Sequence, residues 1–432
     1  MKTHDFLCCL NESDTDYNNA LSTKRINLLN SKHFMFTIKD QLKKIPGMVS
    51  DEALDLLYIS LFVFAVDRLV FRSDAEDNWS RKLHIKVPVL SIKKWLKQKE
   101  LIESILNFLS GDYWSVDFYK RELLPYEKEA KLYFADLLIT ADHVKNICLL
   151  SGGLDSFIGA IDALEGSKDI LFVSHYGRGK GAKEYQDTLI ESLSNYYKIN
   201  KKSFFQFYAV VLSGHENTQR TRSLLFFSHA IAIASCSNYY TNLLVPENGF
   251  ISLNIPLTHS RLGSSSTRTT HPYYMELLQN LIDNLGIHVK LINPYQFKTK
   301  GEMLFNCKNI IFLKKHLVDT MSCSHPDSGR MLKEKTPRHC GNCLPCIIRR
   351  AAIKHAGFID QSNYRNTTLK ESKTAKINLN TYNIAINKFK SKYAFLKIQN
   401  AGEINKNILE YTDLYCRGMN ELKKIIEKIN AL

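Results

Sequence analysis

The feature that most constrains the fold is the motif Ser-Gly-Gly-Leu-Asp-Ser at residues 151–156, directly after four apolar residues. The apolar run at residues 147–150 predicts a short buried strand, and residues 156–164 predict a helix. Between a strand and a helix, a glycine pair lets backbone N–H groups turn toward an anion, to which the helix N-terminus adds positive charge. The motif therefore predicts a phosphate cradle; the alternative is a tight glycine turn capped by Asp155. The expected cradle residues are Ser151, Gly152, Gly153, Leu154, Asp155 and Ser156.

From residue 146 onward, strand-like and helix-like segments alternate, which is typical of a parallel α/β sheet. The predicted strands are residues 147–150, 170–174, 205–212, 243–246 and 289–292. The predicted helices are residues 156–164, 182–197, 223–237, 273–285 and 301–313. We therefore predict a five-stranded parallel sheet with helices on both faces, whose ligand lies beyond the carboxyl ends of the strands.

The chain has 432 residues, which is enough for more than one domain. An apolar helix at residues 51–72 and an alternating strand at residues 81–90 indicate an appended α+β domain before the α/β region. After the α/β region, an Asn- and Lys-rich stretch ends in a helix at residues 407–429. The predicted domains are residues 1–140 (appended α+β), 141–320 (nucleotide-binding α/β), 321–358 (cysteine module) and 359–432 (basic, mostly helical extension).

The composition is that of an ordinary globular protein, with 44% apolar and 23% charged residues. Neither a signal peptide nor an apolar stretch long enough to span a bilayer is visible, so we expect a cytoplasmic protein without a membrane partner. Much of the net charge of +15 lies in residues 333–432, which contain 19 Lys and Arg against 8 Asp and Glu. Lysine dominates there, without the interleaved arginine and aromatic residues that bind single strands, which argues against a specific nucleic-acid partner.

The loops after the second and third predicted strands contain candidate nucleotide contacts. Tyr176 and Gly177 open a glycine-rich stretch that suits close approach of a flat ligand; a flexible turn is the alternative. Arg220 and Arg222 precede the next predicted helix, where two arginines oppose the helix dipole. An anion should compensate them, and the triphosphate of a nucleotide is the favoured one over a solvated basic turn.

The loops after the fourth and fifth strands contain candidate substrate contacts. Glu247 and Asn248 follow the fourth strand, and residues 258–272 form a polar loop dense in hydroxyl and guanidinium groups. Such a loop suits a polar heterocycle with a carboxylate, or nucleotide phosphates; the alternative is a disordered linker. Lys300 supplies a further cation at the ligand edge of the sheet. The candidate contacts within the polar loop are Arg261, Thr267 and Arg268.

Four cysteines form a second motif, which predicts a metal site. Cys340, Cys343 and Cys346 are spaced three residues apart, and Cys323 lies 17 residues before the first of them. Four thiolates meet the tetrahedral requirement of a structural zinc ion, which performs no chemistry when all its positions are filled. His325 or His339 could replace one thiolate, and an iron–sulfur cluster would use the same cysteines.

These motifs resemble those of a known family. The motif at residues 151–156 resembles the pyrophosphate loop of the PP-loop ATP pyrophosphatases. Together with the cysteine pattern, it resembles the QueC family, the 7-cyano-7-deazaguanine synthases, over residues 146–357. Further segments resemble the QatC branch, which consists of QueC-like proteins from bacterial antiphage defence systems; they are residues 67–70, 111–112, 255–258 and 266–272. The resemblance implies the Rossmann-like sheet of the adenine nucleotide alpha hydrolases.

The resemblance also implies a chemistry. ATP would bind the cradle with Mg²⁺ near Asp155, and the carboxylate of 7-carboxy-7-deazaguanine would attack the α-phosphorus. An amine would then capture the acyl-adenylate, forming a C–N bond. Catalysis would come from positioning and charge neutralisation rather than from a covalent nucleophile. The implied catalytic residues are Asp155, Ser156, Arg222 and Lys300, with Arg220 as a further cation.

The identity of the amine stays open at this point. Resemblance to the defence branch favours an amine on a partner protein from the same defence operon, and a homodimer is also compatible with the sequence. One alternative is a 7-cyano-7-deazaguanine synthase that uses ammonia. The others are a tRNA-modifying PP-loop enzyme and a non-catalytic scaffold that binds nucleotide.

Overall fold

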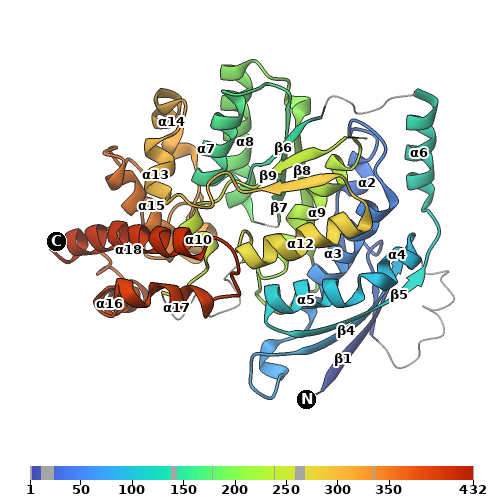
Figure 1. Ribbon diagram of the computed structural model, residues 1–432, viewed down its shortest axis with the longest axis horizontal. Coiled ribbons are helices and arrows are strands. Elements are labelled where there is room, and N and C mark those ends of the chain that lie inside the picture. The colour runs from blue at the N-terminus through green and yellow to red at the C-terminus, as the bar shows by residue number, and fades with distance from the viewer. Residues whose placement is uncertain are drawn as a thin grey trace.

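The computed structural model describes residues 2–10, 24–137, 144–177, 179–237, 239–257, 268–332, 334 and 336–431. Two parallel sheets dominate it, with helices packed around them (Figure 1). Among the described residues, we find no helix with the length and apolar character needed to cross a membrane.

The first sheet is built from the N-terminal part of the chain. Its strands are β1 Thr3–Cys9, β2 Lys24–Asn27, β4 Lys82–Val89 and β5 Tyr113–Lys120, in the order β2-β1-β4-β5. All three pairings are parallel, so this part is an α/β unit, and the expectation of an α+β domain is wrong in this respect. The alternating apolar residues of β4 predicted a half-buried strand. They did not show whether its partner strands run parallel or antiparallel to it. The helices of this part are α2 Ile38–Gln41, α3 Asp51–Leu69, α4 Ile92–Lys97, α5 Lys99–Ser110 and α6 Pro125–Leu137.

The second sheet contains five parallel strands that overlap the five predicted segments. They are β6 Asn146–Leu149, β7 Ile170–Tyr176, β8 Phe204–Val211, β9 Thr241–Leu244 and β10 Val289–Ile292. The sheet order is β10-β9-β6-β7-β8-β3, so the sheet has six strands rather than the five expected. The sixth, β3 Phe34–Phe36, comes from the N-terminal part and pairs antiparallel with β8. Three residues are too few to show a period in the sequence.

Helices cover both faces of the second sheet. They are α7 Leu154–Leu164, α8 Lys180–Tyr197, α9 Arg222–Ala234, α10 Gly249–Ser252, α12 Pro272–Leu285, α13 Lys300–Phe305 and α14 Ile310–His316. Ile147 and Leu149 of β6 join the hydrophobic cluster of α9, whereas Cys148 and Leu150 join the cluster of α7 and α8. This alternation is expected for a strand that is buried on both faces. The predicted helix at residues 301–313 is divided in two, because Asn309 caps a new helix by accepting from the Phe312 N–H at 3.0 Å.

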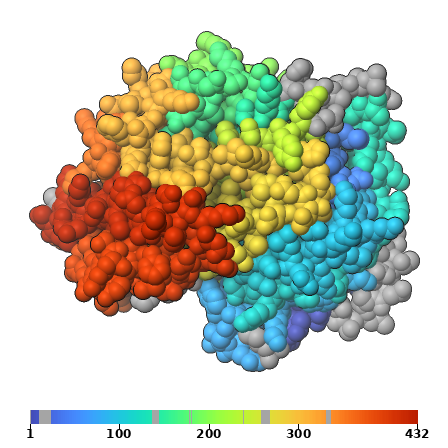
Figure 2. All heavy atoms as spheres, viewed as in Figure 1, coloured from blue at the N-terminus to red at the C-terminus, as the bar shows by residue number. Residues whose placement is uncertain are grey.

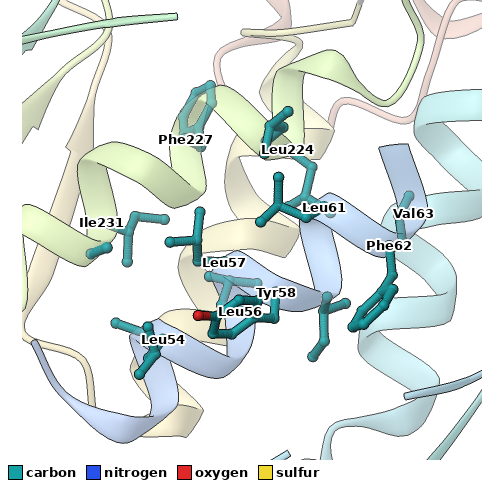
Figure 3. Packing of buried hydrophobic residues seen from close by; sticks show 14 of the residues in the cluster. Leu54, Leu56, Leu57, Tyr58, Leu61, Phe62, Val63, Leu224, Phe227 and Ile231 are labelled. Atoms are coloured by element: carbon teal, nitrogen blue, oxygen red, sulfur yellow. The ribbon is translucent and has the colours of Figure 1, made fainter. Parts of the chain in front are cut away.

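The N-terminal part and the second sheet share a hydrophobic cluster. Helix α3 is buried along nearly its whole length and packs against α9. Figure 3 shows Leu57 and Leu61 of α3 facing Leu224 and Ile231 of α9. Because the cluster takes side chains from both sides of residue 140, the N-terminal part is joined to the sheet through a common core.

The C-terminal helices pack beside the cysteine segment. They are α15 Leu344–His355, α16 Lys373–Asn387, α17 Ala394–Gln399 and α18 Ile408–Asn430, and in Figure 2 they adjoin the yellow and orange segments. Buried Glu421 of α18 accepts a hydrogen bond from the Thr299 hydroxyl, and Arg417 pairs with Glu302. Thr299 and Glu302 form the capping box of α13. The contacts from α18 therefore fix the start of α13, where Lys300 is the first residue.

A buried ion network stabilises the end of α3. The Asp67 carboxylate lies 2.6 Å from Arg81 Nη2 and accepts from the Thr221 hydroxyl at 2.8 Å. Asp112 pairs with Arg81 at 2.7 Å and with Arg72 at 3.0 Å. Burial alone would raise the pKa of Asp67. The neighbouring cations, Arg81 foremost, have the larger effect and lower that pKa below its usual value. The network thus connects the first sheet to the loop that precedes α9.

Replacing Asp67 with alanine should destabilise the protein strongly. It leaves Arg81 buried with one carboxylate partner fewer, and breaking a buried pair costs about 3–5 kcal/mol of unfolding free energy. The control is Asp413→Ala, which removes an exposed pair with Arg417 and should cost less than about 1 kcal/mol. Urea unfolding of both variants measures the difference; equal small losses would contradict the assigned role of the network.

Candidate functional site

A cavity of about 600 Å³, here called the edge cavity, lies beyond the carboxyl ends of the second sheet. It is lined by residues 151–156 after β6, by the end of β7, by the loop after β8 and by Glu247 after β9. Arg222 and Lys300, the first residues of α9 and α13, also line it. Its position is the one at which a parallel α/β sheet binds ligands.

The predicted cradle forms at the start of α7. Gly152 has a φ of +86°, which residues with a side chain rarely adopt. The Ser156 hydroxyl donates to the Gly153 carbonyl at 3.0 Å and accepts from the Ser151 N–H at 3.1 Å. On α8, Gln186 Nε2 donates to the Ser151 carbonyl at 3.2 Å. The loop is therefore held in front of an 11-residue helix, whose N-terminus favours an anion.

Asp155 connects the cradle to two other elements. Its Oδ2 accepts from the Asn248 backbone N–H at 3.2 Å and from Asn248 Nδ2 at 2.7 Å. Its Oδ1 lies 3.0 Å from Lys300 Nζ, and both side chains are largely buried. The structure thus brings together three of the predicted residues around one carboxylate, and that carboxylate neutralises the lysine.

Arg222 contacts the end of β7. Its Nε donates to His175 Nδ1 at 3.4 Å, and its Nη2 donates to the His175 carbonyl at 3.5 Å. Both contacts are long, and burial lowers the pKa of Arg222. Glu247, on the opposite side of the cradle, accepts from the Thr270 hydroxyl, and its carbonyl accepts from Asn293 Nδ2 at 2.9 Å. The edge cavity therefore has a cationic wall at Arg222 and a carboxylate at Glu247.

Four predicted ligand residues are not among the described residues that line the edge cavity. One is Asn248, whose amide binds Asp155 instead. The Tyr176 ring packs on Tyr208, with the ring centroids 5.2 Å apart. Arg220 lies 5.2 Å from the centroid of the Trp79 ring, and burial lowers its pKa to about 10. Arg268 donates to the Phe108 carbonyl at 2.6 Å. Both arginines thus contact the N-terminal part of the chain. The predicted substrate contacts Arg261 and Thr267 lie outside the described residues.

The four predicted metal ligands come together. The Sγ atoms of Cys323, Cys340, Cys343 and Cys346 all lie within 4.8 Å of one another. Cys323 and Cys343 are 4.0 Å apart and Cys340 and Cys346 are 3.9 Å apart. Four sulfurs bound tetrahedrally at about 2.3 Å from zinc are separated by about 3.8 Å, so the cluster fits a structural metal such as zinc. Backbone N–H groups donate to Cys323 at 3.2 Å and to Cys340 at 3.3 Å, which stabilises thiolates.

The cysteine cluster is connected to the cradle. The Met321 N–H donates to the Gly152 carbonyl at 2.8 Å, two residues before the first cysteine ligand. Buried Arg349 of α15 donates to the Thr320 hydroxyl at 2.6 Å and to the Leu317 carbonyl at 2.7 Å. The residues just before Cys323 are therefore bonded to the cradle through Met321 and to helix α15 through Leu317 and Thr320.

Two buried histidines near this site make the stability depend on pH. Burial lowers the pKa of His229 to about 4 and that of His271 to about 3, from 6.5. The unfolded chain therefore binds more protons than the folded protein below pH 6.5, and stability falls as the pH falls toward 4. We expect each histidine to remove about 2 kcal/mol of unfolding free energy between pH 7 and pH 5. Urea unfolding at the two pH values tests this, with exposed His288→Gln as a control whose slope stays that of the wild type.

Reasoning from the sequence missed four side chains at or beside the site. Phe64 and Arg68 of α3 line the edge cavity, as does His175 at the end of β7. Gln186 braces the cradle from α8. A signal for Arg68 was present, since Asp67 and Arg68 are adjacent charges that follow an apolar run in the second half of the helix. The others carried no signal, because their roles depend on which elements pack together.

Comparison of the chain with protein-family models, with curated proteins and with solved structures finds no match.

Proposed function

We propose that this protein uses ATP to adenylate a carboxylic acid and passes the acyl group to an amine. The observation that carries the proposal is the convergence, in the edge cavity, of the cradle on α7 with the side chains of Arg222 and Lys300. A cradle at a helix N-terminus suits the pyrophosphate part of ATP. Cations on two sides of it suit the charge that develops when pyrophosphate leaves.

The reaction needs no covalent nucleophile from the protein. An acid oxygen bonds to the α-phosphorus while the bond from that phosphorus to the bridging oxygen breaks, releasing pyrophosphate. The amine nitrogen then attacks the acyl carbon, AMP leaves with the bonding electrons, and the nitrogen gives its proton to solvent. Positioning and charge neutralisation provide the acceleration.

The side chains take different parts in this scheme. Ser151 and Ser156 shape the cradle, and Arg222 and Lys300 face the phosphates. Asp155 keeps Lys300 in place and is also bonded to Asn248. Because this carboxylate already has partners, Mg²⁺ would enter with ATP, held chiefly by phosphate oxygens near Asp155, and would offset phosphate charge.

The resemblance to the QueC family supports 7-carboxy-7-deazaguanine as the acid. Glu247 lines the edge cavity and offers a carboxylate acceptor to the N–H groups of such a heterocycle. The resemblance to the defence branch supports an amine on a partner protein, plausible candidates being the N-terminal amines of proteins from the same operon. The protein would then act as a C–N ligase in an antiphage defence system of the cytoplasm.

Product analysis distinguishes the acceptors. The purified protein is incubated with ATP and 7-carboxy-7-deazaguanine, with either ammonium or the proteins encoded beside it. We expect AMP and pyrophosphate in both reactions and a mass increase on one protein in the second. An unmodified protein together with free nitrile would identify a 7-cyano-7-deazaguanine synthase instead. No AMP in either reaction would overturn the proposed activity.

A further inference from the structure

We propose that Arg68 and Arg222, together with His175, form a second anion site in the edge cavity, separate from the cradle. The site would bind an oxyanion, either a phosphate of ATP or the carboxylate of the acid. This inference rests on the proposed function and adds a residue from the N-terminal part of the chain to the site. All three side chains line the edge cavity.

The two arginines are half-buried and lack the carboxylate partner that guanidinium groups away from solvent normally have. Arg68 Nη2 donates to the Thr218 carbonyl at 2.7 Å and Nη1 to the Phe64 carbonyl at 3.2 Å, and the guanidinium stacks 3.6 Å from the Phe64 ring centroid. The Arg222 guanidinium hydrogen-bonds only to His175 among the described residues. Within the described part of the chain, neither arginine has a carboxylate oxygen within 4.0 Å. By contrast, Arg72 and Arg81 in the nearby ion network are both paired.

Two arginines side by side in the lining of the edge cavity repel each other, and a bound anion would lower the free energy of this arrangement. Burial lowers the pKa of Arg68 to about 10; the negative charge of Asp67 partly offsets this, and the positive charge of Arg222 adds to it. Since Arg222 is also the first residue of a 13-residue helix, the positive end of the helix dipole adds to the same wall. Such a wall favours a ligand with two or more charged oxygens, which the planar guanidinium groups can bind with paired N–H donors.

His175 supplies an independent indication of a ligand. Its Nδ1 accepts from Arg222 Nε, so the proton of the neutral ring lies on Nε2. The ring is neutral because burial, and then the charge of Arg222, keep the pKa of His175 well below 6.5. The side chain is 2% exposed, and Nε2 has no hydrogen-bond partner among the described residues. A buried N–H donor normally has a partner, and we infer that the oxyanion bound at the two guanidinium groups supplies it.

The second anion site differs from the cradle in position and charge. The cradle lies between β6 and α7, and its nearest cation, Lys300, is neutralised by Asp155 at 3.0 Å. The second site lies at β7, α3 and α9 and carries two charges without carboxylate partners. Adenylation brings two anionic substrates together, so two anion sites in one cavity match its requirement.

Substitution of Arg68 tests the inference. Arg68→Gln keeps an N–H donor for the Thr218 carbonyl and removes the charge, while Arg68→Lys keeps the charge and loses the planar fork. Arg25→Ala removes an exposed arginine of β2 that is not among the cavity-lining residues. Calorimetric titration of the full-length variants with Mg·ATP, and separately with 7-carboxy-7-deazaguanine, measures each dissociation constant without requiring turnover.

We expect Arg68→Gln to raise one dissociation constant at least about tenfold, Arg68→Lys to raise it less, and Arg25→Ala to leave it unchanged. Weaker binding of Mg·ATP alone assigns the site to a phosphate, and weaker binding of the acid alone assigns it to the carboxylate. Wild-type affinity for both ligands in either folded Arg68 variant would overturn the inference. If the protein adenylates no acid, the Mg·ATP titrations still decide whether Arg68 binds phosphate, so failure of the proposed function is distinguishable.

Discussion

Replacing Asp155 with asparagine is expected to reduce ATP-dependent acid activation by about 10²–10³-fold, the usual effect of losing one preorganised electrostatic contact. The carboxylate lies 3.0 Å from Lys300 Nζ and accepts two hydrogen bonds from Asn248. An amide of the same shape retains the acceptor for Asn248 but leaves the buried lysine without its counter-charge. Lys300 would then lose the position from which it faces the phosphates.

Exchange of labelled pyrophosphate into ATP, in the presence of the acid, measures this loss. The matched control is Asp162→Asn on the same helix, α7. Asp162 accepts from the Tyr295 hydroxyl at 2.6 Å and from the Lys308 N–H at 2.8 Å, and it is not among the residues that line the edge cavity. We expect the control to exchange at nearly the wild-type rate. Near-wild-type exchange by Asp155→Asn would contradict the proposed role of the carboxylate.

Loss of a cysteine ligand is expected to cause the second large effect, on stability and on ATP binding together. Cys343→Ser should abolish stoichiometric metal binding and lower the free energy of unfolding by at least about 5 kcal/mol, since structural zinc sites contribute about 10–16 kcal/mol in small peptides. Because the Met321 N–H donates to the Gly152 carbonyl, the cradle should loosen when the cluster does. Affinity for Mg·ATP should therefore fall in the same variant.

Elemental analysis, urea unfolding and ATP titration measure the three consequences. Cys416→Ser is the control, because Cys416 is partly exposed on α18 and outside the cluster. One zinc ion per chain is the expected content, and strong visible absorbance with bound iron would identify an iron–sulfur cluster instead. A metal-free wild-type protein as stable as the metal-bound form would contradict a structural metal site.

Local patterns of the sequence predicted the elements of the second sheet and the center of the site. Residues 289–292 form β10 as expected, and three of the four clustered cysteines lie within seven residues at the start of α15. The cradle was predictable because its strand, glycines and helix are adjacent in the chain. In each case the signal and the structure are local.

Features that depend on packing between distant segments could not be predicted. Strand β3 pairs with a strand about 170 residues away in the sequence, as in the contact of Phe36 with Ala209. Arg220 and Arg268 have the composition of ligand contacts but pack against Trp79 and Phe108 of the N-terminal part. Arg68 lines the cavity only because α3 packs against α9. No periodicity reveals which helix covers which end of a sheet.

The proposed reaction begins when an oxygen of the acid attacks the α-phosphorus of ATP. The most direct test supplies 7-carboxy-7-deazaguanine with ¹⁸O in both carboxylate oxygens and measures the mass of the AMP formed. Attack by the acid transfers one labelled oxygen to each AMP when the amine later captures the acyl group. We predict singly labelled AMP. Unlabelled AMP, with its new oxygen taken from water, would rule out attack by the acid.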